Sequence, residues 1–182
     1  MKRAGLIILD RDGVINFDSP HYIKSTAEFK PIPGSIEAIA RLYQKGFSIF
    51  VATNQAGLAK GKFEQHALDA MHQKLIGLVD QAGGQIEYIY YCPHHPDENC
   101  QCRKPQPGML LQIAKHAALP IEDADFVGDS LKDVEAAYAA NANPVLVLTG
   151  NGRTTANLIE RKIPIFRDLA DYADTKLQTS KL

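Results

Sequence analysis

The segment Leu6-Ile7-Ile8-Leu9-Asp10-Arg11-Asp12-Gly13 joins a short apolar run to two carboxylates and a glycine. Four consecutive apolar residues predict a strand that is buried on both faces, as in a parallel sheet. Asp10 and Asp12 lie two positions apart, so both point the same way from the carboxyl end of this strand, where open α/β sheets bind ligands. Because carboxylates this close repel each other, they require a divalent cation or a shared proton. A strand-ending turn is the alternative interpretation, since Asp and Gly are common turn residues.

Apolar runs of strand length alternate with amphipathic segments along the rest of the chain. The expected strands cover residues 6–9, 47–52, 86–91, 124–127 and 144–148, with a short sixth at 164–166. The expected helices cover residues 36–43, 68–79, 109–118 and 132–140. Such alternation is typical of a parallel sheet with helices on its faces. We therefore predict a Rossmann-like α/β fold in which residues 1–182 form a single domain, with a frayed tail after residue 174.

The composition excludes several classes of protein. The chain has 182 residues, of which 45% are hydrophobic, and this is enough to bury a substantial core. A formal net charge of −1 without an extended basic patch argues against nucleic acid as a partner. The first apolar run has only four residues before Asp10, which is too short for a signal peptide or a membrane span. We therefore expect a cytoplasmic protein that contacts no membrane, and we expect a monomer because no exposed apolar stripe is evident.

Three further polar clusters follow expected strands or precede expected helices. Thr53-Asn54-Gln55 offers a hydroxyl and two amides that can donate hydrogen bonds to an anion. Arg103-Lys104-Pro105 offers cations, and Gly128-Asp129-Ser130 is followed one helical turn later by Asp133, so both carboxylates can face one spot. Each cluster alone has a capping or surface-charge explanation. Together they bring an acid pair, a hydroxyl, a cation and a further acid to one edge of the sheet.

All three cysteines lie within eleven residues, close to a histidine. Cys92-Pro93-His94 followed by Cys100-Gln101-Cys102 supplies four ligands for a closed tetrahedral zinc site, which would be structural because no position is left for water. His95 is an alternative ligand, but the spacing of Cys92 and His94 is repeated by the later pair, so we prefer His94. An odd number of clustered cysteines argues against a disulfide framework. Free thiols or a stray disulfide remain the alternative.

The order of these clusters resembles the four motifs of the haloacid dehalogenase-like phosphatase superfamily. The matching residues are Asp10 with Asp12, then Thr53, Lys104 and Asp129. The resemblance implies that Asp10 is a nucleophile that forms an aspartyl phosphate, while Asp12 protonates the leaving oxygen and later activates water. It also implies that Asp10, the backbone carbonyl of Asp12 and Asp129 bind magnesium. Thr53 and Lys104 would hold the phosphoryl oxygens.

Longer stretches around three of these motifs narrow the resemblance to one family. The stretches are Thr53-Asn54-Gln55-Ala56-Gly57, Cys92-Pro93-His94-His95-Pro96 and Arg103-Lys104-Pro105-Gln106-Pro107-Gly108-Met109. They are similar to the D-glycero-D-manno-heptose-1,7-bisphosphate 7-phosphatase family, which is close to histidinol-phosphate phosphatases. Only about twenty residues separate Asp12 from Pro33, so no large cap domain fits. The resemblance implies a magnesium-dependent phosphatase in the synthesis of ADP-heptose for lipopolysaccharide or a related glycoconjugate.

Without a cap, we expect loops to select the phosphorylated sugar substrate. The expected substrate-binding residues are Asp18, His21, Asn54, Gln55, Arg103 and Ser130. Arg103 is expected to grip a distal anion through its fork of donors. Two positions depart from the family pattern, because Lys60 stands where many relatives have arginine and Ser130 stands where many have lysine. These departures leave the substrate and its anomer open.

Three alternative functions follow from the same residues. Histidinol-phosphate phosphatase is the nearest, since its chemistry at phosphorus is identical. A polynucleotide 3'-phosphatase shares the Thr53-Asn54-Gln55 style of motif, but the missing basic groove disfavours it. A zinc-stabilised phosphate-binding module that has lost catalysis belongs to another class of protein. That module predicts a missing acid, whereas Asp10, Asp12 and Asp129 are all present.

Overall fold

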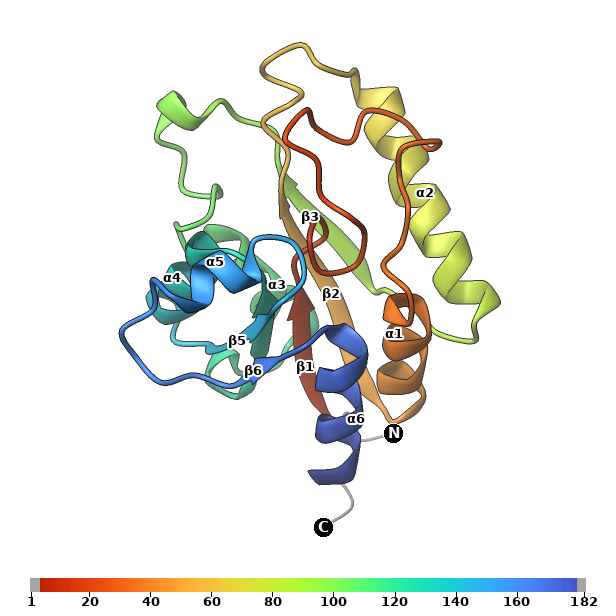
Figure 1. Ribbon diagram of the computed structural model, residues 1–182, viewed down its shortest axis with the longest axis vertical. Coiled ribbons are helices and arrows are strands. Elements are labelled where there is room, and N and C mark those ends of the chain that lie inside the picture. The colour runs from red at the N-terminus through yellow and green to blue at the C-terminus, as the bar shows by residue number, and fades with distance from the viewer. Residues whose placement is uncertain (1–3, 180–182) are drawn as a thin grey trace.

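The computed structural model describes residues 4–179, whose strands form one six-stranded sheet (Figure 1). The strands are β1 (Gly5–Leu9), β2 (Phe47–Asn54), β3 (Tyr88–Cys92), β4 (Asp125–Gly128), β5 (Asn143–Val147) and β6 (Ile165–Phe166). Every pair is parallel, and the order across the sheet is β3-β2-β1-β4-β5-β6. The chain first adds β2 and β3 on one side of β1, and then adds β4, β5 and β6 on the other side. The carboxyl ends of β1 and β4 therefore form a topological switch point, where such sheets bind ligands.

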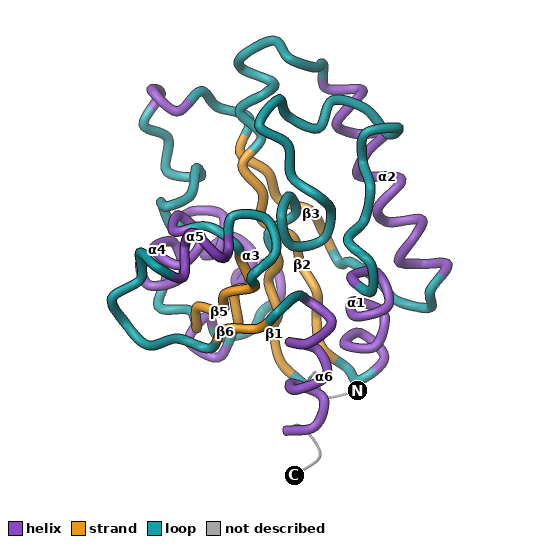
Figure 2. The backbone as a smooth tube through the Cα atoms, viewed as in Figure 1, coloured by secondary structure: helices purple, strands orange, loops and turns teal. Residues whose placement is uncertain are grey.

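Alternating side chains on the strands divide the core into two layers. In β1, Ile7 and Leu9 face one layer while Leu6 and Ile8 face the other. The first layer is covered by α1 (Ser35–Gln44), α2 (Gln65–Gln81) and α6 (Leu169–Thr179), and the second by α3 (Gly108–Ala117) and α4 (Leu131–Ala140). Short helices lie at η1 (Pro96–Glu98), η2 (Ile121–Asp123) and α5 (Gly152–Ala156). The predicted parallel sheet with helices on both faces is confirmed (Figures 1 and 2).

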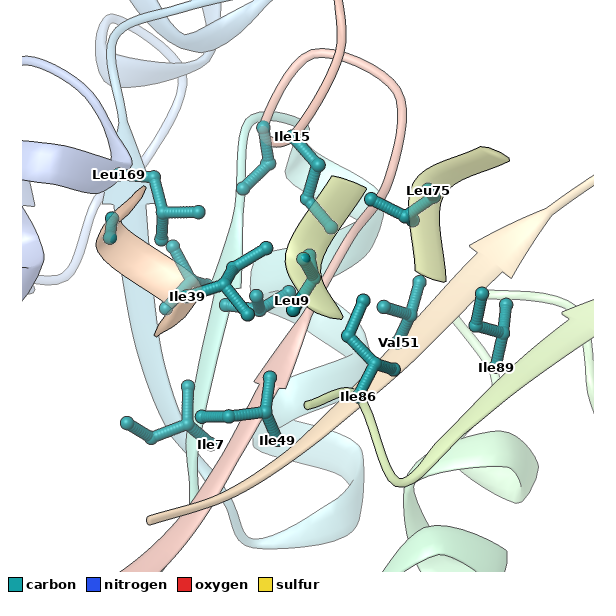
Figure 3. Close-up of a cluster of buried hydrophobic side chains, with 14 of the residues drawn as sticks. Ile7, Leu9, Ile15, Ile39, Ile49, Val51, Leu75, Ile86, Ile89 and Leu169 are labelled. Carbon is teal, nitrogen blue, oxygen red and sulfur yellow. The ribbon is translucent and has the colours of Figure 1, made fainter. Parts of the chain in front are cut away.

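The first layer holds β1 rigidly in place (Figure 3). Ile7 and Leu9 are fully buried between neighbouring strands and the helices above them. Their partners in Figure 3 include Ile39 of α1, Leu75 of α2 and Leu169 of α6. Burial of each such side chain contributes about 2–3 kcal/mol. A strand fixed on both faces gives the acids that follow it a defined position.

Helix α6 was not expected from the sequence. Its buried residues are Leu169, Tyr172 and Ala173. They form a short apolar stripe on the first layer, and the Tyr172 hydroxyl and Lys176 Nζ both lie 2.7 Å from Asp125 Oδ2. The prediction that the chain frays after residue 174 was therefore wrong for residues 175–179, which continue the helix and pack Leu177 against the same layer. Residues 180–182 lie outside the described residues.

Long loops, rather than a second domain, cover the carboxyl ends of the strands. Between residues 4 and 179, no further domain is inserted into the α/β unit, as the prediction of no large cap required. Figure 2 shows loops at residues 10–34, 55–64 and 93–107 gathered beyond the ends of β1, β2 and β3. The first loop is anchored by the Ser35 hydroxyl, which donates to the Ile15 carbonyl at 2.7 Å. No helix in the described part of the chain is long and apolar enough to cross a membrane.

Candidate active site

Lys104 lies at the centre of a buried group of carboxylates. Its Nζ is 2.8 Å from Asp10 Oδ1 and 2.7 Å from Asp133 Oδ1, and the residue is only 2% exposed. Burial alone would lower the pKa of Lys104, but the two carboxylates outweigh it and raise the pKa above its ordinary value. Lys104 therefore carries a full positive charge between the end of β1 and the start of α4.

One buried ammonium does not balance the negative charge gathered here. Asp10, Asp129 and Asp133 offer carboxylate oxygens that all lie within 4.8 Å of one another. Burial and the charge of Asp133 raise the pKa of Asp10 well above its ordinary value and that of Asp129 to about 7. For Asp133 itself, burial is outweighed by Lys104, so its pKa is lowered. A cluster of hard oxygen ligands with surplus negative charge fits a divalent cation such as Mg²⁺.

Two glycines make room for the Asp129 carboxylate. A Cβ added at Gly13 or at Gly150 would lie 2.2 Å from Asp129 Oδ2, and both glycines have positive φ, +85° and +54°. Asn151 then orients the same oxygen, because its main-chain N–H donates to Oδ2 at 2.7 Å and its Nδ2 at 3.2 Å. Gly13, which follows β1, thus leaves the space that the carboxylate of Asp129 occupies at the end of the neighbouring strand β4.

Asp12 occupies a different environment from Asp10. Its carboxylate accepts hydrogen bonds from Arg11 Nη2 at 2.9 Å, from Asn16 Nδ2 at 2.8 Å and from Gln55 Nε2 at 2.9 Å. Burial favours the protonated form, but the Arg11 charge and these donors outweigh it and lower the pKa of Asp12. The pKa values of the two acids are thus shifted in opposite directions, which is typical of acids with different catalytic tasks.

The polar cluster at the end of β2 faces the same site. Thr53 is buried and still belongs to β2, and its Oγ1 accepts a hydrogen bond from Gln55 Nε2 at 2.9 Å. Asn54 uses its side chain differently, because its Nδ2 donates to the Lys104 carbonyl and its Oδ1 accepts from the Lys104 N–H, both at 3.1 Å. The amide of Asn54 is therefore engaged with protein, and its predicted substrate contact stays a prediction.

A cavity of about 490 Å³ opens above these groups. The predicted site residues that line it are Asp10, Asp12, Asp18, Thr53, Asn54, Gln55, Arg103, Lys104, Asp129 and Ser130. His21 does not line the cavity and is exposed, so the structure does not bring this predicted substrate contact to the site. Ser130 reaches the cavity, but its hydroxyl donates to Asp133 Oδ2 at 2.7 Å as part of the helix cap of α4.

Several residues of the site were not identified as such from the sequence. Asp133 was expected near Asp129, because it lies one helical turn further on. Its ion pair with Lys104 was not predicted. Asn16 and Asn151 hold Asp12 and Asp129 through contacts that no motif marks. No sequence signal marks the Asn151 contact, which joins the loop after β5 to the end of the neighbouring strand β4, 22 positions away.

The predicted zinc ligands come together beside this site. Cys92, His94, Cys100 and Cys102 offer ligand atoms within 4.8 Å of one another, and His94 Nδ1 is 3.5 Å from Cys92 Sγ and 3.2 Å from Cys102 Sγ. His95 lies outside the cluster, because its Nδ1 accepts from the Asp97 N–H at the start of η1. The geometry therefore agrees with the choice of His94, and the four donors suit Zn²⁺.

The parallel sheet and the acids around a buried lysine define a hydrolase of the haloacid dehalogenase-like class. The HAD-hydrolase-like family model matches residues 101–172, a range that includes Lys104, Asp129 and Asp133. The chain is 53% identical over 172 residues to the D-glycero-beta-D-manno-heptose-1,7-bisphosphate 7-phosphatase of Pseudomonas putida, covering 92% of this chain and 97% of that relative. This chain belongs to the D-glycero-beta-D-manno-heptose-1,7-bisphosphate 7-phosphatase family.

Two further relatives extend this similarity. The enzyme of the same name from Escherichia coli is 39% identical over 157 residues, with 82% of each chain covered. The crystal structure of D,D-heptose 1,7-bisphosphate phosphatase from B. bronchiseptica, complexed with magnesium and phosphate, is 45% identical and has a TM-score of 0.93. The match covers 96% of this chain and 98% of that one, so the whole α/β unit is shared.

Proposed function

We propose that this chain is a magnesium-dependent phosphomonoesterase that removes the 7-phosphate of D-glycero-β-D-manno-heptose 1,7-bisphosphate. The observation that carries the proposal is the buried ion pair of Lys104 with Asp10 and Asp133, next to a separately held second acid, Asp12. The names of the relatives support the substrate and its β anomer. The complex of the B. bronchiseptica enzyme with magnesium and phosphate supports the metal and the reaction.

Asp10 and Asp12 divide the proposed reaction into two halves. In the first, an Asp10 carboxylate oxygen attacks phosphorus, the bond from phosphorus to the sugar oxygen breaks, and that oxygen takes a proton from Asp12. In the second, Asp12 takes a proton from water while the water oxygen attacks phosphorus. The bond between phosphorus and Asp10 then breaks, which releases inorganic phosphate and restores the Asp10 carboxylate. Lys104 orients Asp10, and Lys104 with Thr53 would hold the phosphoryl oxygens.

The donors around Asp12 suit the second half of the reaction. They stabilise its carboxylate, which is the form that accepts a proton from water. The first half needs the protonated form. The negative charge of a phosphoryl group beside Asp12 would raise its pKa toward that form.

Asp10, Asp129 and the main-chain carbonyl of Asp12 would hold the magnesium ion. Asp133 is less suited, because Oδ1 faces Lys104 and Oδ2 accepts from the N–H of Ser130 and from its hydroxyl. When bound, magnesium neutralises the negative charge that develops on the phosphoryl oxygens.

We propose a structural zinc ion at Cys92, His94, Cys100 and Cys102. Four protein ligands leave no open position for water, which is typical of structural rather than catalytic zinc. Residues 92–102 lead directly into Arg103 and Lys104. The metal would thus fix the segment that delivers the catalytic lysine.

Arg103 is the proposed contact for the distal phosphate of the substrate. It lines the cavity, and its Nη1 is buried without a hydrogen-bond partner among the described residues. A buried guanidinium donor left unpaired is costly, and an anion in the cavity would satisfy it with charge-assisted hydrogen bonds. Asp18 and Gln55 line the same cavity and are proposed to contact the sugar.

The proposed protein is a single cytoplasmic domain that acts as a monomer. One continuous sheet supports the single domain for residues 1–182. Three cysteines that form no disulfide among the described residues support a reducing compartment. Size-exclusion chromatography with light scattering tests the oligomeric state.

Phosphate release from matched substrates tests the proposed function. Both anomers of D-glycero-D-manno-heptose 1,7-bisphosphate and histidinol phosphate would be compared at equal concentrations, with magnesium and with EDTA. We expect magnesium-dependent release that is fastest with the β anomer, and none from an Asp10→Asn variant. Preference for histidinol phosphate would contradict the substrate, and folded protein that binds phosphate without turnover would favour the non-catalytic module.

A further inference from the structure

Arg11, between the two acids of the first motif, is a completely buried arginine. Its side chain is 0% exposed, and its guanidinium carbon lies 5.8 Å from the centre of the Phe29 ring. Its Nε donates to Asp12 Oδ1 at 3.1 Å, and its Nη2 donates to both carboxylate oxygens, at 2.9 Å to Oδ1 and 3.1 Å to Oδ2. Two parallel donors from a planar group fix both the position and the plane of the carboxylate. The orientation of Asp12 therefore depends on the orientation of Arg11.

The remaining guanidinium nitrogen of Arg11 faces His72 of α2. Its Nη1 lies 3.2 Å from His72 Nε2. Because arginine only donates, His72 must accept through Nε2, with its ring neutral and its proton on Nδ1. Burial, together with the Arg11 charge, lowers the pKa of His72 to about 4, against the smaller opposite effects of Asp12 and Asp69. The ring of Tyr91 packs at 5.8 Å on the same histidine.

His72 reaches the catalytic machinery through the hydrogen bond to this arginine. It is 8% exposed, belongs to a helix of the first layer and does not line the cavity of about 490 Å³. Histidine is less often fully buried than apolar residues, and buried polar groups generally need a hydrogen-bond partner. Here its one acceptor atom completes the set of partners around Arg11.

We propose that His72 is a positioning residue, which fixes Arg11 by accepting a hydrogen bond and thereby orients Asp12 toward the leaving oxygen of the substrate. The inference rests on the proposed function, in which Asp12 protonates that oxygen. Without His72 as acceptor, a buried charged donor loses its partner, and such a loss drives the guanidinium to rotate toward another acceptor. Asp12 turns with it, because three of its hydrogen bonds come from the same group.

The dependence of the rate on the leaving group distinguishes positioning from mere packing. A sugar alkoxide is a poor leaving group and needs the proton from Asp12, whereas p-nitrophenolate leaves without protonation. Misorientation of Asp12 should therefore slow hydrolysis of the sugar phosphate far more than hydrolysis of p-nitrophenyl phosphate. A general loss of stability or of folded protein lowers both rates by the same factor.

The experiment compares three variants through kcat/KM for heptose 1,7-bisphosphate and for p-nitrophenyl phosphate, with magnesium present. His72→Leu fills the space but cannot accept a hydrogen bond, while the side-chain oxygen of His72→Gln can take the place of Nε2. Met71→Leu alters packing at the neighbouring buried position of α2. We expect His72→Leu to lower the sugar phosphate value about tenfold more than the aryl phosphate value. His72→Gln and Met71→Leu should keep the ratio of the unmodified chain.

Equal losses on both esters in His72→Leu would overturn the inference, as would the same change of ratio in Met71→Leu. Should His72→Leu fail to fold, His72→Met replaces it, because a thioether fills similar space and accepts only weakly. Absence of turnover by the unmodified chain on both esters would overturn the proposed function, and this inference with it. Turnover by the unmodified chain with an unchanged ratio in the variant overturns the inference alone.

Discussion

The side-chain amide of Asn54 pairs with both main-chain groups of Lys104, with two hydrogen bonds of 3.1 Å. The contact joins the end of β2 to the segment that follows the cysteine cluster, across 50 positions of sequence. Lys104 then extends its ammonium between Asp10 and Asp133. An asparagine at the sheet edge thus sets the direction from which the lysine enters the site.

Asn54→Ala should lower kcat strongly and leave KM nearly unchanged, because Lys104 loses the anchor of its main chain. Two hydrogen bonds disappear, and buried backbone groups left unpaired cost about 1–3 kcal/mol each, so the unfolding temperature should fall as well. Steady-state kinetics and thermal unfolding measure the two effects. Gln44→Ala is the matched control, because Gln44 Nε2 makes a similar contact to the Gly83 carbonyl far from the site. An unchanged kcat in Asn54→Ala would contradict this role.

Gly150→Ala should abolish magnesium binding. The new Cβ would lie 2.2 Å from Asp129 Oδ2 and would displace that carboxylate from the cluster. Gly61→Ala is the matched control, because Gly61 also has a positive φ, +61°, but has nothing within 4 Å of the added Cβ. Isothermal titration with Mg²⁺ measures the affinity of each folded variant. Equal affinities in the two variants would show that Asp129 is not needed as a ligand.

The contrast between Gly13 and Asn151 shows what sequence can and cannot predict in this site. Gly13 stands inside a motif beside two acids, and local spacing was enough to place that motif at the end of a strand. Asn151 acts on Asp129 from the loop after β5, and no local pattern marks an asparagine that meets an acid 22 positions away. Sequence reasoning predicted the sheet and the acids because both depend on local periodicity.

Three expectations were wrong or stay unconfirmed, and each concerns a different part of the chain. Helix α6 is stabilised by three apolar residues that pack on the first layer, and the polar tail after residue 174 continues this helix. His21 was grouped with its neighbours in the loop, but it is exposed and does not line the cavity. Ser130 was expected to contact substrate, yet its hydroxyl caps α4 through Asp133. Helix α6 depends on a tertiary contact, whereas the contact of Ser130 is local to the start of α4.

His94→Ala should release zinc and reduce activity, whereas His95→Ala should retain both. Only His94 belongs to the four-residue cluster, and His95 instead starts η1. Loss of one ligand opens the site, and the segment that leads to Lys104 loses its fixed shape. Zinc content by elemental analysis and kcat measure the outcome. Equal zinc loss in the two variants would contradict the assignment of His94.

His72 should make the unfolding free energy depend on pH between about 6.5 and 4. Its pKa is about 4 in the folded protein, whereas a histidine in the unfolded chain has a pKa of about 6.5. Between these values the unfolded chain binds more protons, so this contribution to stability is fully present above pH 6.5 and is lost as the pH falls toward 4. One pH unit below 6.5 the loss is about 1 kcal/mol, and near pH 4 it approaches about 3 kcal/mol. Urea unfolding at pH 7, 5.5 and 4.5 measures the effect. The unmodified chain and Met71→Leu should lose more stability on acidification than His72→Gln, because glutamine has no titratable group. Equal losses of stability in all three proteins would show that the fold does not hold His72 neutral.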